Sequence, residues 1–597
     1  MDKLSLAKIK EIIGEQHAGD FKQLEVVFSS EERVLVEAPA GYGKTTTMIS
    51  RIAYLLAKGE IPNPKRILAL TFSVNAALKI KRDIAEKMPL LMKEENNPVL
   101  LTEKITSTNY HGFCKSVLSK HGFLLDINLR RNINSFKAVG DNNLERIKDI
   151  YTILDINELN ICKSIEETVK SGVMPNDMDV RIYLDIVKNK LLPQNIITHN
   201  SELFLTIQLF EEYPEVISFY RRLFTLIIVD EFQDTNIVAW KLIQKLIGEK
   251  TKLLFLGDPL QRIYGFIGAL PDIMDLAMQN YNMKKIVLNK NYRFRDNFEM
   301  LKLDYNIRLN AASVMQNVGI TGEAELPGYW GKTQAEEAMQ VATAVCNLMN
   351  SQKGMKIAIL CRGRNENSSV IEEKLLDKGI NYFYGMFTDD DVDYINFHTV
   401  CHETFLDYFG KKRTINNIQF KKFTDKIKGV YREATGKSLS SLLKLLDALR
   451  DKVSSDYAML SPEDKYTLIL DIFENRQLRQ SMEYVNCDVI LATVHGAKGL
   501  EWDYVFLPDL EQWAFPVYPI CILCEGKNQK CGSKCKFICT NVVQKPMLEE
   551  LSVFYVGVTR AKKQVFVSAS GKRANGNASR YSCFATMAGV KLVKSNV

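Results

Sequence analysis

Residues suited to phosphate binding occur in a glycine-rich segment near the N-terminus, "VLVEAPAGYGKTTTMISRIAYLL", residues 34–56. The loop ends in Gly43, Lys44 and Thr45, the order found in loops that cradle phosphates with backbone N–H groups ahead of a helix. In such loops the lysine reaches the β- and γ-phosphates and the hydroxyl ligates Mg²⁺. We therefore predict an ATP site with Mg²⁺ at Thr45, in which the remaining cradle contacts come from Ala40, Gly41, Tyr42, Gly43 and Thr46.

The loop departs from the usual pattern at one position, because Ala38 stands where the first glycine is expected. That glycine mainly permits a tight turn, and alanine tolerates many such turns. Gly41 and Gly43 still flank the cradle. We therefore expect the loop to bind nucleotide despite the substitution.

A second set of reactive side chains is the acidic pair in "FTLIIVDEFQDTN". Asp230 and Glu231 follow an apolar run, so they lie at the carboxyl end of a predicted buried strand. Taken alone, such a pair is usually a solvated strand end. Together with the phosphate loop it predicts that Asp230 binds Mg²⁺ and that Glu231 orients the attacking water during ATP hydrolysis.

The elements that must position these residues are short apolar runs without alternation, which is typical of strands buried on both faces of a parallel sheet. Helical patterns follow most of them, which predicts an α/β fold. The predicted strands are Val34–Glu37, Ile67–Phe72, Leu226–Val229, Leu253–Leu256, Ile286–Leu288, Ile357–Leu360, Val489–Ala492, Tyr504–Leu507 and Val565–Val567.

Two regions, residues 89–204 and 389–483, are polar and mostly helical in pattern. We interpret them as helical inserts in the α/β fold. A chain of 597 residues is too long for one core, so several domains are expected.

The N-terminus lacks a signal-peptide core and no run is long enough to span a membrane, which indicates a cytoplasmic protein. The formal charge of +7 permits a polyanionic partner without requiring one.

Six motifs in order carry a family resemblance: "TFSVNAA" at 71–77, "DEFQDT" at 230–235, "GDPLQRIYGFIGA" at 257–269, "NYRF" at 291–294, "TVHGAKGLEWD" at 493–503 and "YVGVTRAKK" at 555–563. The chain resembles superfamily 1 DNA helicases of the UvrD/Rep/PcrA group over residues 20 to 570. The resemblance implies two RecA-like parallel-sheet motor domains with ATP between them, each carrying a mainly helical inserted domain. The implied boundaries are 1–88 with 205–285 for the first motor domain, 89–204 for its insert, 286–388 with 484–575 for the second motor domain, 389–483 for a shortened second insert, and 576–597 for a C-terminal tail.

The resemblance also implies further residues at the ATP site. Arg293 and Arg560 are similar to the two arginines that reach the γ-phosphate from the second motor domain, where arginine stabilises the transferring group by about 10³–10⁵ in rate. The other implied contacts are adenine reading by Gln23, adenine stacking by Tyr292, γ-phosphate sensing by Gln261 and an acidic interface group at Glu501.

A single-stranded DNA track is implied in the same way. Such tracks combine aromatic side chains that stack on bases with polar groups along the phosphates. Family members often have Trp-Arg where this chain has Phe266 and Ile267, so we expect a weaker grip at that step. The implied stacking residues are Phe72, Tyr110, His111, Tyr264 and Phe266, and the implied phosphate contacts are Thr71, Thr493 and His495.

A cysteine-rich segment within residues 517–543, "CILCEGKNQKCGSKCKFIC", lies outside the family pattern. Its spacing can present four thiolates to a structural Zn²⁺, and nearby lysines favour the thiolate form. An iron–sulfur cluster and a reduced loop without metal are the alternatives. The candidate ligands are Cys521, Cys524, Cys531 and Cys535, with Cys539 as the fifth cysteine.

These observations predict an ATP-dependent DNA helicase or translocase that moves along single-stranded DNA and acts on tailed duplexes. The resemblance implies 3′-to-5′ movement. The alternative is an ATP-gated DNA sensor or anchor subunit that unwinds little and serves a separate nuclease, repair or anti-phage defence subunit. Few residues follow Arg560 and they contain no carboxylate cluster, so any nuclease would belong to a partner.

Overall fold

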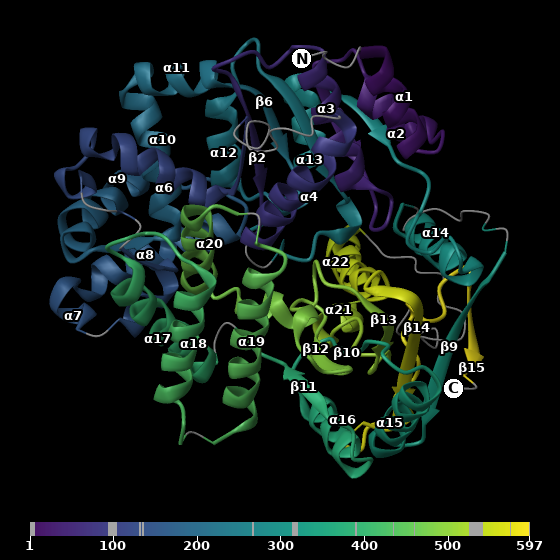
Figure 1. Cartoon of the computed structure of the whole chain (residues 1–597). Coiled ribbons are helices and arrows are strands. Elements are labelled where there is room, and N and C mark those ends of the chain that lie inside the picture. The colour runs from purple at the N-terminus through teal and green to yellow at the C-terminus, as the bar shows by residue number, and fades with distance from the viewer. Residues whose placement is uncertain are drawn as a thin grey trace. The chain divides into compact units, whose positions relative to one another are not determined.

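The computed structural model describes residues 6–92, 104–130, 133, 136–147, 149–265, 268–312, 320, 322–388, 391–433, 435–458, 460–523, 541–573 and 575–595. The chain forms two compact units, whose elements are labelled in Figure 1. The first unit comprises Met1–Lys290, His402–Asn416 and Asp456–Gln477, and the second comprises Asn291–Cys401, Asn417–Ser455 and Leu478–Val597.

The first unit is built on a six-stranded parallel sheet in the order β3-β2-β6-β7-β1-β8. Its central strands are almost wholly buried, as a parallel sheet covered on both faces requires. The carboxyl ends of β1, β2, β6 and β7 therefore meet at one edge of the sheet. The strands are β1 (Arg33–Glu37), β2 (Arg66–Thr71), β3 (Ile105–Asn109), β6 (Phe224–Val229), β7 (Lys252–Gly257) and β8 (Lys284–Val287).

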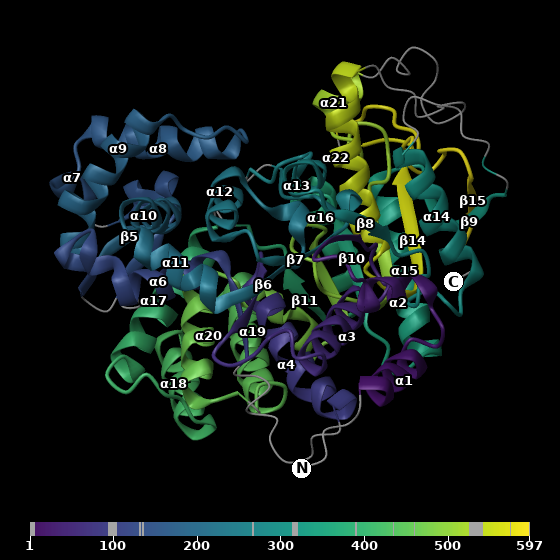
Figure 2. The same ribbon diagram turned by 90° about the horizontal axis from the view of Figure 1, so that it is seen from above.

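Helices cover both faces of this sheet. Val34 and Val36 of β1 belong to one apolar core with α1–α4, whereas Leu35, between them, belongs to the other core. In Figure 2, α3 and α4 lie on one side of β6 and β7, and α12 and α13 lie on the other. These helices are α1 (Leu6–Gln16), α2 (Phe21–Phe28), α3 (Lys44–Ala57), α4 (Val74–Met92), α12 (Ile237–Leu246) and α13 (Ile273–Tyr281).

The rest of the first unit is mainly helical, and its apolar residues continue the second of these cores. A two-stranded parallel ladder, β4 (Lys137–Val139) with β5 (Ile196–Thr198), lies within it. Residues 456–477 of the second predicted insert group with this unit, and the predicted domain boundaries stay predictions. The helices are α6 (Tyr110–His121), α7 (Ile150–Ile153), α8 (Ile156–Lys170), α9 (Asp177–Ile186), α10 (His199–Glu212), α11 (Pro214–Leu223) and α20 (Pro462–Glu474).

The second unit contains a seven-stranded parallel sheet in the order β11-β12-β10-β13-β14-β9-β15. The strands are β9 (Ala324–Gly331), β10 (Ile357–Cys361), β11 (Tyr382–Gly385), β12 (Val489–Thr493), β13 (Trp502–Leu507), β14 (Ala561–Ser570) and β15 (Val590–Lys594). The helices are α14 (Phe298–Ala312), α15 (Gln334–Ser351), α16 (Glu366–Asp377), α18 (Asn417–Val430), α19 (Lys437–Ser454), α21 (Tyr518–Leu523) and α22 (Asn541–Val558), while α17 (Val392–Phe409) runs from this unit into the first.

The predicted α/β class with two parallel sheets is confirmed, and each predicted strand overlaps an observed one. Within the predicted C-terminal tail, Val590–Lys594 forms β15 and pairs with β9 along five residues. Throughout the described parts of the chain, the search for a helix both long and apolar enough to cross a bilayer finds none.

Candidate functional site

The predicted phosphate loop joins β1 to α3, as the sequence indicated. The loop's positive φ angles are at Gly41, 83°, and Gly43, 78°, where glycine is the residue without a steric penalty. Ala38 has no positive φ; it is fully buried, and its N–H donates to the Gly257 carbonyl at 2.9 Å. Alanine therefore satisfies the first position of the loop because the turn there does not need glycine.

Lys44, the first residue of α3, lies against the acidic pair. Its Nζ is 2.5 Å from Glu231 Oε1 and 3.3 Å from Asp230 Oδ1. Burial alone would lower the pKa of Lys44, but the charges of Asp230 and Glu231 outweigh burial and raise it above the ordinary value. Lys44 is therefore fully charged at neutral pH, as a ligand for phosphate must be.

The acidic pair has the chemistry of a Mg²⁺ site. Burial, together with the charge of Glu231, raises the pKa of Asp230 although Lys44 acts in the opposite direction. Glu231 adopts a left-handed backbone with φ 53°, and its N–H donates to Asp230 Oδ1 at 3.0 Å. Two adjacent carboxylates beside one ammonium favour a divalent cation, so Asp230 and the half-buried Thr45 hydroxyl fit Mg²⁺.

A hydrogen-bonded chain connects the acidic pair to Gln261. Gln233 Nε2 donates to Glu231 Oε2 at 2.6 Å, and Gln233 Oε1 accepts from the Asp258 N–H at 3.0 Å. Asp258 Oδ2 in turn accepts from Gln261 Nε2 at 2.7 Å. Sequence reasoning missed Gln233 and Asp258, although both lie inside the quoted motifs, Gln233 four residues after β6 and Asp258 directly after β7.

Gln23, predicted to read adenine, is buried on α2. Its Nε2 donates to the Tyr42 carbonyl of the phosphate loop at 3.0 Å, and its Oε1 is hydrogen-bonded to His17. His17 Nε2 is 2.8 Å from Ser50 Oγ on α3. The side chain of Gln23 is thus fixed next to the loop, and adenine reading stays a prediction.

In the second unit, the predicted arginines lie together. The Arg293 guanidinium is hydrogen-bonded to the Thr559 carbonyl and forms an ion pair with Glu501. Arg560, the next residue after Thr559, donates from Nη2 to Thr559 Oγ1 at 3.1 Å and from Nη1 to the Leu500 carbonyl at 3.2 Å. Three residues predicted for the ATP site therefore form one cluster, and the half-buried Tyr292 precedes Arg293.

Two residues predicted to stack on bases pair with each other in the first unit. The rings of Phe72 and Tyr264 have centroids 4.9 Å apart and are inclined by 22°, and both are half-buried. Thr71, which precedes Phe72, has a buried Oγ1 with no hydrogen-bond partner among the described residues. A stacked pair beside an unsatisfied hydroxyl suits a base and a phosphate.

The other predicted DNA contacts differ in placement. Tyr110 is buried and its hydroxyl is 3.0 Å from Thr235 Oγ1, which is the setting of a core aromatic and does not favour stacking on a base. His111 is half-buried and contacts Glu202. In the second unit, Thr493 Oγ1 accepts from the Gly496 N–H at 3.1 Å. Phe266 lies outside the described residues.

His495 lies near cations of the second unit. Burial lowers the pKa of His495 to about 3, with smaller contributions from Arg362, Lys498 and Arg479. The imidazole is therefore neutral at pH 7, so it can meet a phosphate as a hydrogen-bond donor but not as a cation.

An arginine-bearing pocket of about 410 Å³ in the second unit was missed by sequence reasoning. Arg362 and Arg364 follow β10, and Arg573 has its guanidinium 5.8 Å from the Trp513 ring centroid. Carboxylates hold all three arginines in place, for example Glu550 at 2.5 Å from Arg362 Nη2. Arginines and an aromatic ring in one pocket suit a nucleic-acid strand, and the signal was the position of "CRGRN" directly after a buried strand.

Three buried carboxylates, Glu337, Asp509 and Glu511, interact with one another, and Asp509 lines this pocket. Burial raises the pKa of Glu337 well above its usual range and that of Asp509 to about 7. The folded chain thus keeps protons that the unfolded chain, with carboxyl pKa values near 4, has released. The stability contributed by this cluster therefore falls as pH rises from about 4 to 7 and beyond.

We expect Glu337→Gln to reduce the loss of thermal stability between about pH 6 and pH 8, because glutamine keeps an oxygen for the Asp509 N–H and the Ser568 hydroxyl but never ionises. Melting temperature measured across this range tests the expectation. Glu336→Gln, at the exposed neighbouring position, is the control and should behave as wild type. Equal slopes for wild type and Glu337→Gln would contradict the assignment.

The predicted cysteine site falls largely outside the described residues. Cys521 is buried at α21, and Cys524, Cys531, Cys535 and Cys539 are not described. Zinc binding by this segment stays a prediction.

Comparison with known proteins identifies two family models in this chain. Residues 20–282 match the UvrD/REP helicase N-terminal domain, and residues 395–572 match the UvrD-like helicase C-terminal domain. Similar proteins include the ATP-dependent DNA helicase PcrA of Bacillus subtilis, 26% identical over 92% of this chain and 82% of that protein, and the DNA helicase II of Rickettsia typhi, 23% identical over 93% of both. A probable DNA helicase II homolog of Mycoplasma genitalium is 23% identical over 90% of this chain and 82% of its own length. The chain belongs to the UvrD/Rep/PcrA group of superfamily 1 and is an ATP-dependent DNA helicase.

Proposed function

We propose that this helicase translocates along single-stranded DNA in the 3′-to-5′ direction and separates tailed duplexes by ATP hydrolysis. The direction comes from the family resemblance. The proposal assigns Lys44, Thr45, Asp230 and Glu231 to nucleotide and Mg²⁺, and Phe72 with Tyr264 to the strand.

The observation that supports the proposal most is the link between the two sets of residues in the first unit. Thr71 ends β2 and Phe72 follows it, while Asp230 and Glu231 follow the neighbouring strand β6. The Asp230 N–H donates to the Leu70 carbonyl at 2.9 Å. A change at the Mg²⁺ ligand can therefore be transmitted to the base-stacking residue through one backbone hydrogen bond and two residues of chain.

The chemistry follows from the charges at this sheet edge. Mg²⁺ held by Thr45 and Asp230 would neutralise phosphate charge when bound. When ATP binds, Lys44 contacts the β- and γ-phosphates in place of the Asp230 and Glu231 carboxylates. Glu231 is then free to orient the attacking water and accept its proton. We propose that Arg293 and Arg560 stabilise the charge that develops on the γ-phosphoryl group.

A strand-displacement assay tests the function. We expect separation of a duplex with a 3′ single-stranded tail and none of a blunt duplex or one with a 5′ tail, together with ATPase activity stimulated by single-stranded DNA. Stimulated ATPase without displacement of any substrate would favour the sensor or anchor role. Displacement from a 5′ tail would overturn the proposed direction.

We expect Phe72→Ala and Tyr264→Ala each to weaken single-stranded DNA binding about tenfold or more, since stacking contributes roughly 1–3 kcal/mol per base and 1.4 kcal/mol is tenfold. DNA-stimulated ATPase should fall with binding while the basal rate is retained. Because the two rings stack on each other, the double variant should lose less than the sum of the single losses.

Phe219→Ala is the matched control for these variants, because Phe219 is a 48% exposed aromatic residue elsewhere in the same unit. It should leave DNA binding unchanged, as measured by fluorescence anisotropy with a labelled oligonucleotide. Equal loss of basal and stimulated ATPase in Phe72→Ala would reject the role of Phe72 in the strand track.

A further inference from the structure

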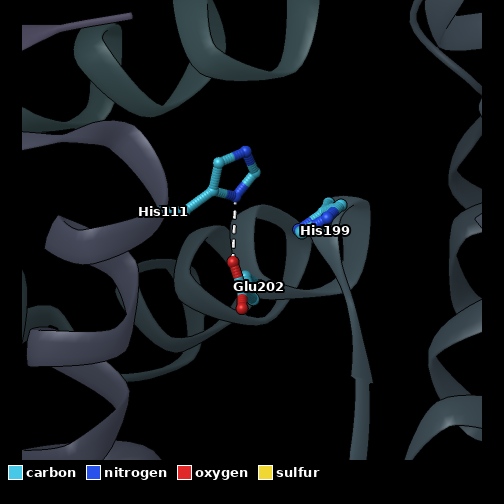
Figure 3. A group of neighbouring side chains, drawn as sticks. All are labelled: His111, His199 and Glu202. Carbon is cyan, nitrogen blue, oxygen red and sulfur yellow. Dashed lines mark hydrogen bonds and ion pairs between the residues drawn. The ribbon is translucent and has the colours of Figure 1, made fainter. Parts of the chain in front are cut away.

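Two histidines and a glutamate of the first unit converge where two helices begin. His111 is the second residue of α6, and His199 and Glu202 lie in the first turn of α10. The i, i+3 spacing places His199 and Glu202 on the same face of α10. Figure 3 shows both rings and the carboxylate grouped together, with His111 Nδ1 2.9 Å from Glu202 Oε2.

One candidate ligand atom from each residue lies within 4.8 Å of the other two, and in the described part of the chain no other group of His, Cys, Asp and Glu meets this condition. Ligand bonds of about 2.0–2.2 Å around tetrahedral Zn²⁺ put neighbouring ligand atoms roughly 3.3 Å apart. The His111–Glu202 pair is already near this spacing. A modest movement of the His199 side chain would complete a three-ligand set.

The hydrogen bonding of the group is incomplete. His199 Nδ1 and Glu202 Oε1 are buried and have no hydrogen-bond partner among the described residues. The Glu202 side chain is fully buried, and the closest cation to Oε1 is Lys115 Nζ at 3.6 Å. Buried polar atoms of a native protein normally form hydrogen bonds, so His199 Nδ1, and Glu202 Oε1 with only its 3.6 Å ion pair to Lys115, indicate a missing partner.

The surrounding charges can accommodate a cation. Lys115 forms an ion pair with Glu474 of α20, and Asp471 of α20 interacts electrostatically with both Lys115 and Glu202. Arg476 is a second cation that acts on His199. Lys81 is a third cation and acts on Asp471, so three carboxylates offset three cations around the group. The dipoles of the two helix N-termini oppose a cation only weakly compared with the bonds from three zinc ligands.

We propose that His111, His199 and Glu202 bind a Zn²⁺ ion that joins the first turn of α6 to the first turn of α10. Two imidazoles and one carboxylate are ligands that zinc accepts, and a fourth position remains for water. The His111 side chain is 28% exposed, which gives the ion a route to the group and lets the other ring nitrogen carry the proton. His111 then serves the metal and not the DNA strand.

Zinc and cobalt binding to the purified full-length protein test this site. After dialysis against a chelator, one equivalent of Co²⁺ should produce visible bands of a nitrogen- and oxygen-ligated ion without the near-ultraviolet thiolate band of a cysteine site. His199→Ala and Glu202→Gln should lose this signal and weaken Zn²⁺ binding by more than the roughly 10–100-fold that loss of an outer hydrogen-bond partner costs. His121→Ala, at the other end of α6, should bind as wild type.

A Cys521→Ser, Cys524→Ser double variant distinguishes this site from the cysteine-rich segment. It should retain the cobalt bands, and added Zn²⁺ should still raise its melting temperature. If His199→Ala does not fold, His111→Ala at its partly exposed position gives the same comparison. Unchanged zinc affinity and cobalt spectrum in the histidine variants would overturn the proposal. So would loss of DNA binding in His111→Ala with zinc binding intact, which would assign His111 to the strand.

Discussion

Lys44→Ala is expected to lower the kcat for ATP hydrolysis by about 10²–10³, the usual cost of removing one preorganised group that stabilises transition-state charge. Strand displacement should stop with it. The variant should also melt at a lower temperature, because Asp230 and Glu231 lose the ammonium that lies 3.3 Å and 2.5 Å from them. This destabilisation should be greater at pH 8 than at pH 5, because burial raises the pKa of Asp230 and so favours its neutral form as the pH falls.

Two variants separate catalysis from stability at this position. Lys44→Arg keeps the positive charge, so it should restore the melting temperature more than the ATPase rate. Lys58→Ala removes the lysine that follows α3 and pairs with Glu60, and it should leave hydrolysis unchanged. If Lys44→Ala hydrolyses ATP as fast as wild type, the assignment of the phosphate loop is wrong.

Arg293→Ala is expected to lower kcat by about 10³ while ATP binding stays nearly unchanged, because arginines of this type act on charge that develops in the transition state. Rapid-quench kinetics with a fluorescent nucleotide-binding assay separates the two quantities. The ion pair with Glu501 and the hydrogen bond to the Thr559 carbonyl hold the guanidinium in place.

Arg295→Ala is the matched control, since Arg295 lies two residues further along and its side chain is 72% exposed. It should hydrolyse ATP at the wild-type rate. Glu501→Gln should cost less than Arg293→Ala, because it keeps the arginine and removes only its charged partner. A parallel loss of ATP affinity and kcat in Arg293→Ala would show that Arg293 acts in binding and not on the transition state.

The central strands of both sheets could be predicted from the sequence because burial on both faces leaves a continuous apolar run. Four strands at or near the sheet edges, β3, β9, β11 and β15, could not, although the edge strand β8 could. β3, "ITSTN", alternates between buried and partly exposed positions, and β9 contains both Pro327 and Gly328. Such strands lack the continuous apolar run that marks a buried strand, because their stability comes from neighbours distant in sequence.

The candidate site likewise contains residues that the sequence predicted and contacts that it did not. Two local patterns predicted Lys44 and the pair Asp230 and Glu231, because a phosphate loop and an acidic strand end are each contained in one short segment of the chain. Neither pattern gave any sign that His111 lies 2.9 Å from a glutamate 91 positions away. That proximity is created by the packing of α6 against α10, and a pattern within one segment does not record it.

The parallel pairing of β15 with β9 has a practical consequence for anyone who shortens or tags this protein. A chain ending before Val590 would lose five residues of ladder and leave β9 with an open row of N–H and C=O groups. Open strand edges recruit other chains, so trimming a tail that looks dispensable would invite self-association. A purification tag at the N-terminus leaves the pairing of β15 with β9 intact.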